Sequence, residues 1–167
     1  GGSAIALTIH FCNIDNSSCP SKIFVTDNNE KRLKHMGKVH KRMKYQIPIE
    51  YILCRTAKNN NNAVEKLREG AIVINATGLG KDSPGSPITD AVVFPKNGLV
   101  WDFNYRGDLM FLDQAKAQQE SRNLTIHDGW NYFIHGWLSV ISEVFNIIVP
   151  SEGPEFQELS IIAANLR

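Results

Sequence analysis

Two apolar runs in the middle of the chain end in polar residues beside glycines. The first run ends in Asn75-Ala76-Thr77-Gly78, and the second continues as Asp102-Phe103-Asn104-Tyr105. A buried parallel sheet brings the carboxyl ends of its strands to one edge, where ligands bind. Amide and hydroxyl groups there can hold a ribose or an amide-bearing ring, and the phenol of Tyr105 can reach a substrate. An ordinary strand-to-loop turn uses the same residue types.

The beginning of the chain offers a second group of candidates, which are Gly1, Gly2 and Ser3. Glycines followed by small and apolar residues are typical of a turn that binds phosphate as it enters a helix. A vector-derived linker has the same composition.

Asp27 follows a short β-branched and aromatic run. In dinucleotide-binding folds an acidic residue at the end of the second strand accepts hydrogen bonds from the adenosine ribose. An aspartate in this position can also cap a helix. A carboxylate repels a ribose 2′-phosphate, which favours NAD over NADP as the cofactor, although Lys31 and Arg32 lie close enough in sequence to weaken this preference.

Helix-like and strand-like patterns alternate along the chain. We expect helices at 3–12, 30–43, 63–69, 108–119, 130–146 and 154–166, and strands at 22–25, 47–54, 71–76, 99–103 and 124–126. The asparagines at 59–62 are expected to cap the third helix at the surface, and a turn of helix is expected near 90–94. This alternation predicts a single domain over residues 1–167, with an α/β fold of the Rossmann type: a doubly wound parallel sheet in three layers.

Composition narrows the classes of function. A chain of 167 residues that is 43% hydrophobic suffices for one sizeable domain. The formal net charge of +1 gives no reason to expect nucleic acid or an anionic membrane as a partner. No apolar run is long enough to cross a bilayer, and the three cysteines lack metal-ligand spacing, which favours free thiols and a cytoplasmic setting.

Other chemistries find little support in the sequence. His127 and His135 have no carboxylate partner at metal-ligand spacing, so we expect no metal site. No serine lies in a Gly-x-Ser-x-Gly nucleophile elbow. His135 and Trp137 fall within an apolar helical pattern and are expected to be core or interface residues.

Three segments together, NATGLGKDSPGSPI, LVWDFNY and HDGWNYFIHG, resemble the nucleotide-binding domain of the shikimate and quinate dehydrogenase family. The resemblance implies an NAD(P)-dependent oxidoreductase of aromatic amino acid biosynthesis that transfers hydride to or from a cyclic alcohol or ketone. It places Gly1, Gly2 and Ser3 at the pyrophosphate and Asp27 at the ribose. The implied cofactor contacts further along the chain are Asn75, Ala76, Thr77, Gly78, Phe103 and Asn131. Tyr105 is implied on the side of the small-molecule substrate.

The chain departs from that family in two respects. The family's catalytic Lys and Asp belong to an N-terminal domain with no counterpart here, so no catalytic residue is expected and the chain alone should be inactive. The family also has a substrate-contacting Gln where this chain has Gly136, and a Gly where it has Asn131. The substrate is therefore open.

Two other functions are compatible with the sequence: a non-catalytic nucleotide-binding or scaffold module, and a methyltransferase that binds S-adenosylmethionine. The chain starts within the implied glycine turn, so we expect the sheet to lack its first strand. The exposed edge that results would favour a homodimer or a rearrangement.

Overall fold

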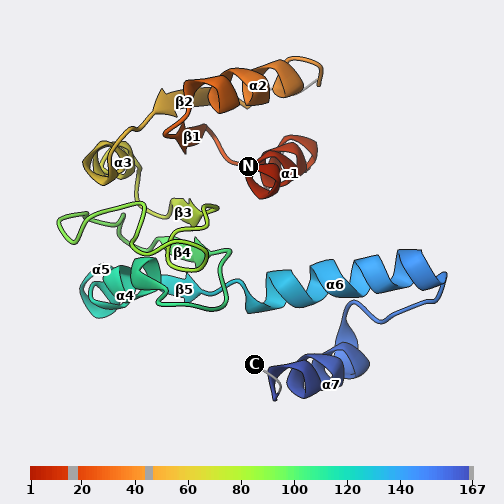
Figure 1. The fold of residues 1–167 in the computed structure, drawn as a ribbon. Coiled ribbons are helices and arrows are strands. Elements are labelled where there is room, and N and C mark those ends of the chain that lie inside the picture. Colours follow the sequence, from red (N-terminus) through yellow and green to blue (C-terminus); the bar gives the residue numbers. More distant parts are fainter. Residues whose placement is uncertain (15–18, 44–46, 166–167) are drawn as a thin grey trace.

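A computed structural model of the chain describes residues 1–14, 19–43 and 47–165 (Figure 1). The helices are α1 (Gly2–Asn13), α2 (Glu30–His40), α3 (Ala57–Val64), α4 (Met110–Lys116), α5 (Gln119–Arg122), α6 (Trp130–Phe145) and α7 (Gly153–Ala164). The strands are β1 (Ile23–Asp27), β2 (Ile49–Leu53), β3 (Ile72–Asn75), β4 (Leu99–Asp102) and β5 (Thr125–His127). The order of helices and strands follows the sequence prediction closely.

The strands form two separate parallel sheets. In the first, β1 pairs with β2, and Ile23 lies opposite Ile49. In the second the order is β3-β4-β5, with Ile72 opposite Leu99 and Leu99 opposite Thr125. The α/β class with parallel strands is confirmed. One continuous sheet is not formed by the described residues, because β1 and β3 do not pair with each other.

The two sheets have separate hydrophobic cores. In the first, Val25 of β1 packs against Leu33 and Met36 of α2, and Ala4 and Ile5 of α1 cover this cluster. In the second, Val73 of β3 and Val100 of β4 pack against α4. The other buried members of this larger cluster are Val64, Ile88, Val92, Phe94, Phe111, Leu112, Ala115 and Leu124. Each sheet therefore has at least one face that is buried by helices of its own half of the chain.

Helix α3 differs from its prediction in position and in the role of its asparagines. It begins at Ala57, because Thr56 and Asn59 form a reciprocal capping box. Asn61, expected at the surface, is 5% exposed and binds the 87–89 loop: its side chain donates to Thr89 Oγ1 at 2.6 Å and accepts from Thr89 N at 3.1 Å. The asparagine run is thus a contact between α3 and a loop.

Smaller differences concern helix ends. The segment expected as one helix at 108–119 is divided into α4 and α5, and residues 90–91 form only a turn where a turn of helix was expected at 90–94. The final helix ends at Ala164, and residue 166, its expected end, lies outside the described residues. None of the helices in the described part is long and apolar enough to cross a membrane.

Helices α6 and α7 form a hairpin that projects from the second sheet (Figure 1). Within α6 only Ile134 is buried, and α7 has no buried residue among those described. Gly153 has a φ of +80°, a conformation that favours glycine, just before Pro154 in the first turn of α7.

A buried histidine connects α1, α2 and β2 in the first half of the chain. His40, at the end of α2, is 0% exposed. Its Nε2 lies 2.8 Å from Thr8 Oγ1 in α1, and its Nδ1 lies 2.6 Å from the hydroxyl of Tyr51 in β2. The one hydrogen of the Thr8 hydroxyl is directed at the Ala4 and Ile5 carbonyls of its own helix. This assigns to His40 the tautomer in which Nε2–H donates to Thr8 and Nδ1 accepts from Tyr51.

The stability of the fold should decrease at acidic pH because of His40. Burial lowers the pKa of His40 in the folded protein. Below the ordinary histidine pKa of about 6.5 the unfolded chain therefore binds a proton that the folded chain resists, and the unfolded state is favoured. We expect the unfolding free energy measured in urea to decrease from pH 8 to pH 5, and to decrease less in His40→Gln.

His127→Gln is the matched control, since His127 lies exposed in β5. It should keep the wild-type pH dependence. A His40→Gln variant with an unchanged pH dependence would contradict the role assigned to this imidazole.

Candidate functional site

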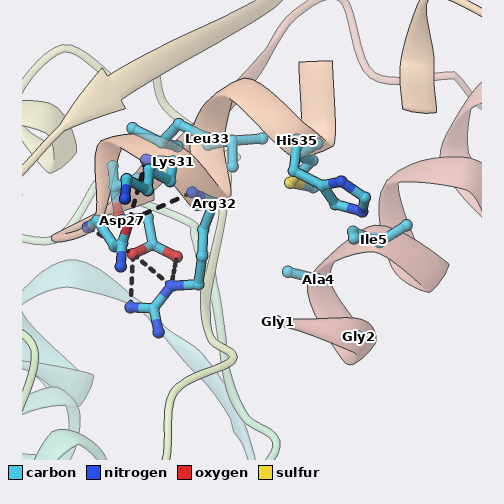
Figure 2. A pocket seen from close by; sticks show the side chains of 13 residues that line it. Gly1, Gly2, Ala4, Ile5, Asp27, Lys31, Arg32, Leu33 and His35 are labelled. Carbon is cyan, nitrogen blue, oxygen red and sulfur yellow. Dashed lines mark hydrogen bonds and ion pairs between the residues drawn. The ribbon is translucent and has the colours of Figure 1, made fainter. Parts of the chain in front are cut away.

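A pocket of about 400 Å³ lies where the start of α1, the end of β1 and the first turns of α2 meet. Figure 2 shows the beginnings of the two helices facing each other across it. Its lining includes Gly1, Gly2, Asp27, Lys31, Arg32 and His35. Gly1, Gly2 and Asp27, which the sequence analysis selected at separate places in the chain, are thus brought into one pocket.

The start of α1 leaves space and hydrogen-bond donors for a ligand. The helix has no side-chain cap, and its first intrahelical acceptor is Gly1 O, which receives Ile5 N at 3.2 Å. The preceding amides at residues 2–4 have no intrahelical acceptor. A Cβ built on Gly1 or Gly2 would meet no atom of the described residues within 4 Å. Neither glycine is therefore needed for packing within the chain.

The carboxylate of Asp27 is held by several donors at the edge of the pocket (Figure 2). Arg32 Nε donates to both carboxylate oxygens at 3.0 Å, and Arg32 Nη2 donates to Oδ1 at 2.7 Å. The amide of Asn29 donates to Oδ1 at 2.8 Å. Burial alone would raise the pKa of Asp27, but the hydrogen bonds from Arg32 and Asn29 outweigh it and lower the pKa. Asp27 is therefore ionised and oriented at neutral pH.

Polar residues at the ends of β3 and β4 form a buried network. Asn75 Nδ2 donates to both carboxylate oxygens of Asp102 at 3.1 Å, and the backbone amide of Asn104 donates to Asp102 Oδ1 at 2.8 Å. Asn75 Oδ1 accepts from the amide and hydroxyl of Thr77 at 3.0 and 2.7 Å. Asn104 Nδ2 donates to the carbonyls of Thr77 and Leu79. Asn75 and Asp102 are 1% and 0% exposed.

This network determines which atoms of the 75–78 segment are accessible. Burial raises the pKa of Asp102, although hydrogen bonds from Asn104 and Asn75 oppose the effect. The side chain of Asn75 is directed into the protein, whereas Thr77 is exposed and Ala76 and Gly78 are half-buried. The roles of Asp102 and Asn104 were missed from the sequence. Their spacing of two residues after a strand is the signal of an Asx turn.

Aromatic side chains cover the ends of β4 and the start of α6. Phe103 stacks on Tyr132 with ring centroids 4.5 Å apart, and Tyr105 stacks on Phe133 at 4.2 Å. Asn131, in the first turn of α6, is exposed. The predicted residues Phe103, Tyr105 and Asn131 therefore lie within one neighbourhood.

Gly129 allows α6 to begin against this strand end. A Cβ at Gly129 would lie 2.1 Å from the carbonyl oxygen of Phe103, and the amide of Gly129 donates to Asn104 O at 2.9 Å. Only glycine fits so close an approach.

The candidates thus fall into two groups. One lines the pocket at α1, β1 and α2; Ser3 is half-buried in the first turn of α1 and does not line it. The other gathers at the ends of β3 and β4 and the start of α6, and the pocket lining includes none of its members. In the described part of the chain, no cluster of three or more His, Cys, Asp or Glu residues could hold a metal ion.

Comparison with protein-family models, with curated proteins and with solved structures found no match to this chain. The function is therefore argued from the site itself.

The buried network should contribute strongly to stability. Asn75→Ala removes a donor to Asp102 and an acceptor for Thr77, and leaves a buried carboxylate short of partners. We expect a loss of about 3 kcal/mol in the free energy of unfolding, measured by chemical denaturation. Asn131→Ala, at an exposed position of the same neighbourhood, should change it by less than about 0.5 kcal/mol. Equal losses in the two variants would show that the network is not what stabilises this edge.

Proposed function

We propose that this chain is the NAD(P)-binding domain of a dehydrogenase similar to the shikimate and quinate dehydrogenases. The observation that carries this proposal is the pocket in which Gly1 and Gly2 at the start of α1 face Asp27 at the end of β1. In dinucleotide-binding folds the diphosphate binds at a helix N-terminus, and the ribose binds an acidic residue at a strand end.

The residues present fit both parts of the cofactor. The uncapped amides at residues 2–4 can donate to a pyrophosphate, and the open space beside Gly1 and Gly2 admits it. The ribose hydroxyls need a carboxylate acceptor. Oδ2 of Asp27 accepts one hydrogen bond within the described residues, from Arg32 Nε, and a carboxylate oxygen can accept two.

The order of the strands supports a Rossmann-type arrangement. In doubly wound dinucleotide-binding sheets the strand order is 3-2-1-4-5-6. The pair β2-β1 corresponds to strands 3-2, and β3-β4-β5 corresponds to strands 4-5-6. We propose that the two sheets are the two wings of such a three-layer fold, with the central position between β1 and β3.

The proposed reaction is hydride transfer between the nicotinamide ring and a cyclic alcohol or ketone. The bound cofactor would supply the hydride chemistry. This chain would hold the adenosine and pyrophosphate at the pocket and present Thr77, Phe103 and Asn131 to the nicotinamide, with Tyr105 towards the substrate. The catalytic Lys and Asp would come from a second domain, as in the family that the chain resembles.

A non-catalytic nucleotide-binding module is the second candidate, and one observation favours it. Among the described residues, those that line the pocket all lie between Gly1 and Met36, so it would hold the adenosine side of a dinucleotide without the residues proposed for the nicotinamide. A module that binds only the adenosine half of a dinucleotide would need no residues beyond those that line this pocket.

Calorimetric titration of NAD tests the pyrophosphate contact through Gly2. In Gly2→Val the branched side chain would enter the space beside the amides at the start of α1, where a Cβ meets no described atom within 4 Å. We expect the dissociation constant for NAD to rise by about ten- to a hundredfold, which corresponds to one lost hydrogen bond to a charged group. The melting temperature should stay close to the wild-type value.

Gly136→Val is the matched control, because Gly136 is also helical and also has no atom within 4 Å of its Cβ. It should bind NAD as the wild type does. Equal affinity in Gly2→Val and wild type would refute the proposed pyrophosphate site, and binding of S-adenosylmethionine without NAD would favour a methyltransferase.

Titration of ADP-ribose beside NAD separates the two candidate functions. A dehydrogenase domain should bind NAD more tightly than ADP-ribose, because the nicotinamide adds contacts near Phe103. In that case Phe103→Ala should remove the difference. Equal affinities for the two ligands in the wild type would support the adenosine-only module.

A further inference from the structure

Most of the large apolar side chains that the described structure leaves exposed lie in the hairpin of α6 and α7. Nine of the twelve fall between Tyr132 and Ile162. Helix α6 has a single charged residue among its sixteen, Glu143. A helix with so little charge is normally buried against other protein, yet only Ile134 of α6 is buried. The hairpin therefore carries an apolar surface that the described residues do not cover.

One stripe of α6 has the spacing of a coiled-coil seam. Four of its residues follow one another at steps of four, three and four: Phe133, Trp137, Val140 and Val144. This spacing places them along one side of the helix. The last three are 54%, 51% and 69% exposed. Phe133 is half-buried, stacks on Tyr105 and contacts Trp137, so the stripe begins at the aromatic residues after β4 and runs along most of α6.

The stripe faces away from α7. Helix α7 packs on another side of α6, where Phe156 stacks on His135 with ring centroids 4.3 Å apart. Residues two apart on an α-helix point in directions that differ by about 160°. Trp137 and its stripe are therefore turned away from the side that α7 occupies, on a helix that projects from the second sheet (Figure 1).

The charge of the hairpin indicates which kind of partner fits the stripe. Residues 130–164 contain four Glu and no Lys or Arg, so an anionic membrane or a nucleic acid would be repelled. The stripe itself is uncharged, and its spacing is that of a helix packed against another helix. A second copy of α6 offers the same spacing and the same apolar side chains.

Large and small side chains match when two copies of α6 run antiparallel about a two-fold axis at the middle of the stripe. Trp137 then lies opposite the partner subunit's Val140. Phe133 lies opposite the partner subunit's Val144. A parallel pair would instead place each aromatic ring opposite its own copy, which packs less evenly. The antiparallel order also separates the two Glu143 carboxylates by about 13 Å along the axis, more than the Debye length of about 8 Å.

The exposed area is sufficient for a stable dimer. Seven of the nine exposed side chains lie between Tyr132 and Ile148, in α6 and the segment after it. At half exposure or more, each leaves on the order of 100 Å² uncovered, or roughly 700 Å² per copy. Two copies would bury up to about 1,400 Å² of this area, and stable interfaces bury about 1,200–2,000 Å² in total.

We propose that two copies of this chain dimerise through the α6 stripe, with the two helices antiparallel. This interface is a helix face, whereas the dimer expected from the sequence would use an exposed sheet edge. The pocket lining includes no residue of α6, so the interface is independent of the proposed nucleotide site.

Sedimentation equilibrium of the full chain at several concentrations tests this interface. We expect a wild-type dimer with a dissociation constant in the micromolar range or below, typical of interfaces of this size. In Val140→Asp two carboxylates would enter an apolar interface without partners, and the dissociation constant should rise at least about a hundredfold. The monomer should stay folded, because half of the Val140 side chain is exposed to solvent.

Ser139→Asp is the matched control, because Ser139 is the neighbouring residue in α6, is exposed and lies on a side of the helix away from the stripe. It should dimerise as the wild type does, and melting temperatures should show that both variants are folded. A wild-type chain that stays monomeric at about 1 mM would overturn the proposal. So would a dimer of equal strength in Val140→Asp, the result expected of an interface at a sheet edge.

Disulfide cross-linking with oxidised glutathione tests the orientation within the same dimer. A mixture of Phe133→Cys and Val144→Cys chains should form a disulfide between these two positions, identified by peptide mass spectrometry. Val144→Cys alone should not cross-link at that position, because the antiparallel order places its two copies about 16 Å apart along the axis and a disulfide needs Cα atoms within about 7 Å. Efficient cross-linking of Val144→Cys to itself would overturn the antiparallel arrangement.

Discussion

The position of α1 depends on one buried imidazole. Thr8 is the one residue of α1 that is fully buried, and its hydroxyl is held by His40. A buried polar group must find a hydrogen-bond partner, and a wrongly placed one costs more than an apolar contact of the same size. The contact between Thr8 and His40 therefore sets the register of α1 against α2 far more sharply than the partly buried Ala4 and Ile5 can. This register therefore determines where the backbone amides of residues 2–4 lie relative to the pocket.

The second half of the chain contains a corresponding buried polar network. No ion pair to Asp102 is found in the described structure; the Asn75 side chain and the Asn104 backbone amide donate to its oxygens instead. Because the network joins the ends of β3 and β4, the loop after β3 cannot move independently of the aromatic residues after β4. Each half thus has its own core and its own polar connection, and each can hold its group of candidate residues in place without pairing between β1 and β3.

The order of the elements could be predicted from the sequence because it depends on local periodicity. The pairing of the strands into two sheets could not be predicted, because strand pairing is a contact between distant segments. Nothing in residues 72–75 specifies whether β1 lies beside them. The start of α3 was misjudged for a related reason. Asparagine suits a cap in isolation, but the reciprocal box between Thr56 and Asn59 places the cap earlier and leaves Asn61 to bind the 87–89 loop. At the site, Asn75 has the residue type of a ligand contact and the burial of a structural residue, and only the fold separates these roles.

The ion pair between Asp27 and Arg32 shows that the type of one residue does not give the local charge at its position in the fold. From the sequence, Asp27 is an acid at a strand end and Arg32 a cation five residues later; their bidentate contact arises because α2 begins at once after β1 and turns its first residues back over the strand end. Water competes for both partners of an ordinary exposed ion pair, but the bidentate geometry of this one and the low exposure of the Asp27 side chain, 15%, strengthen it.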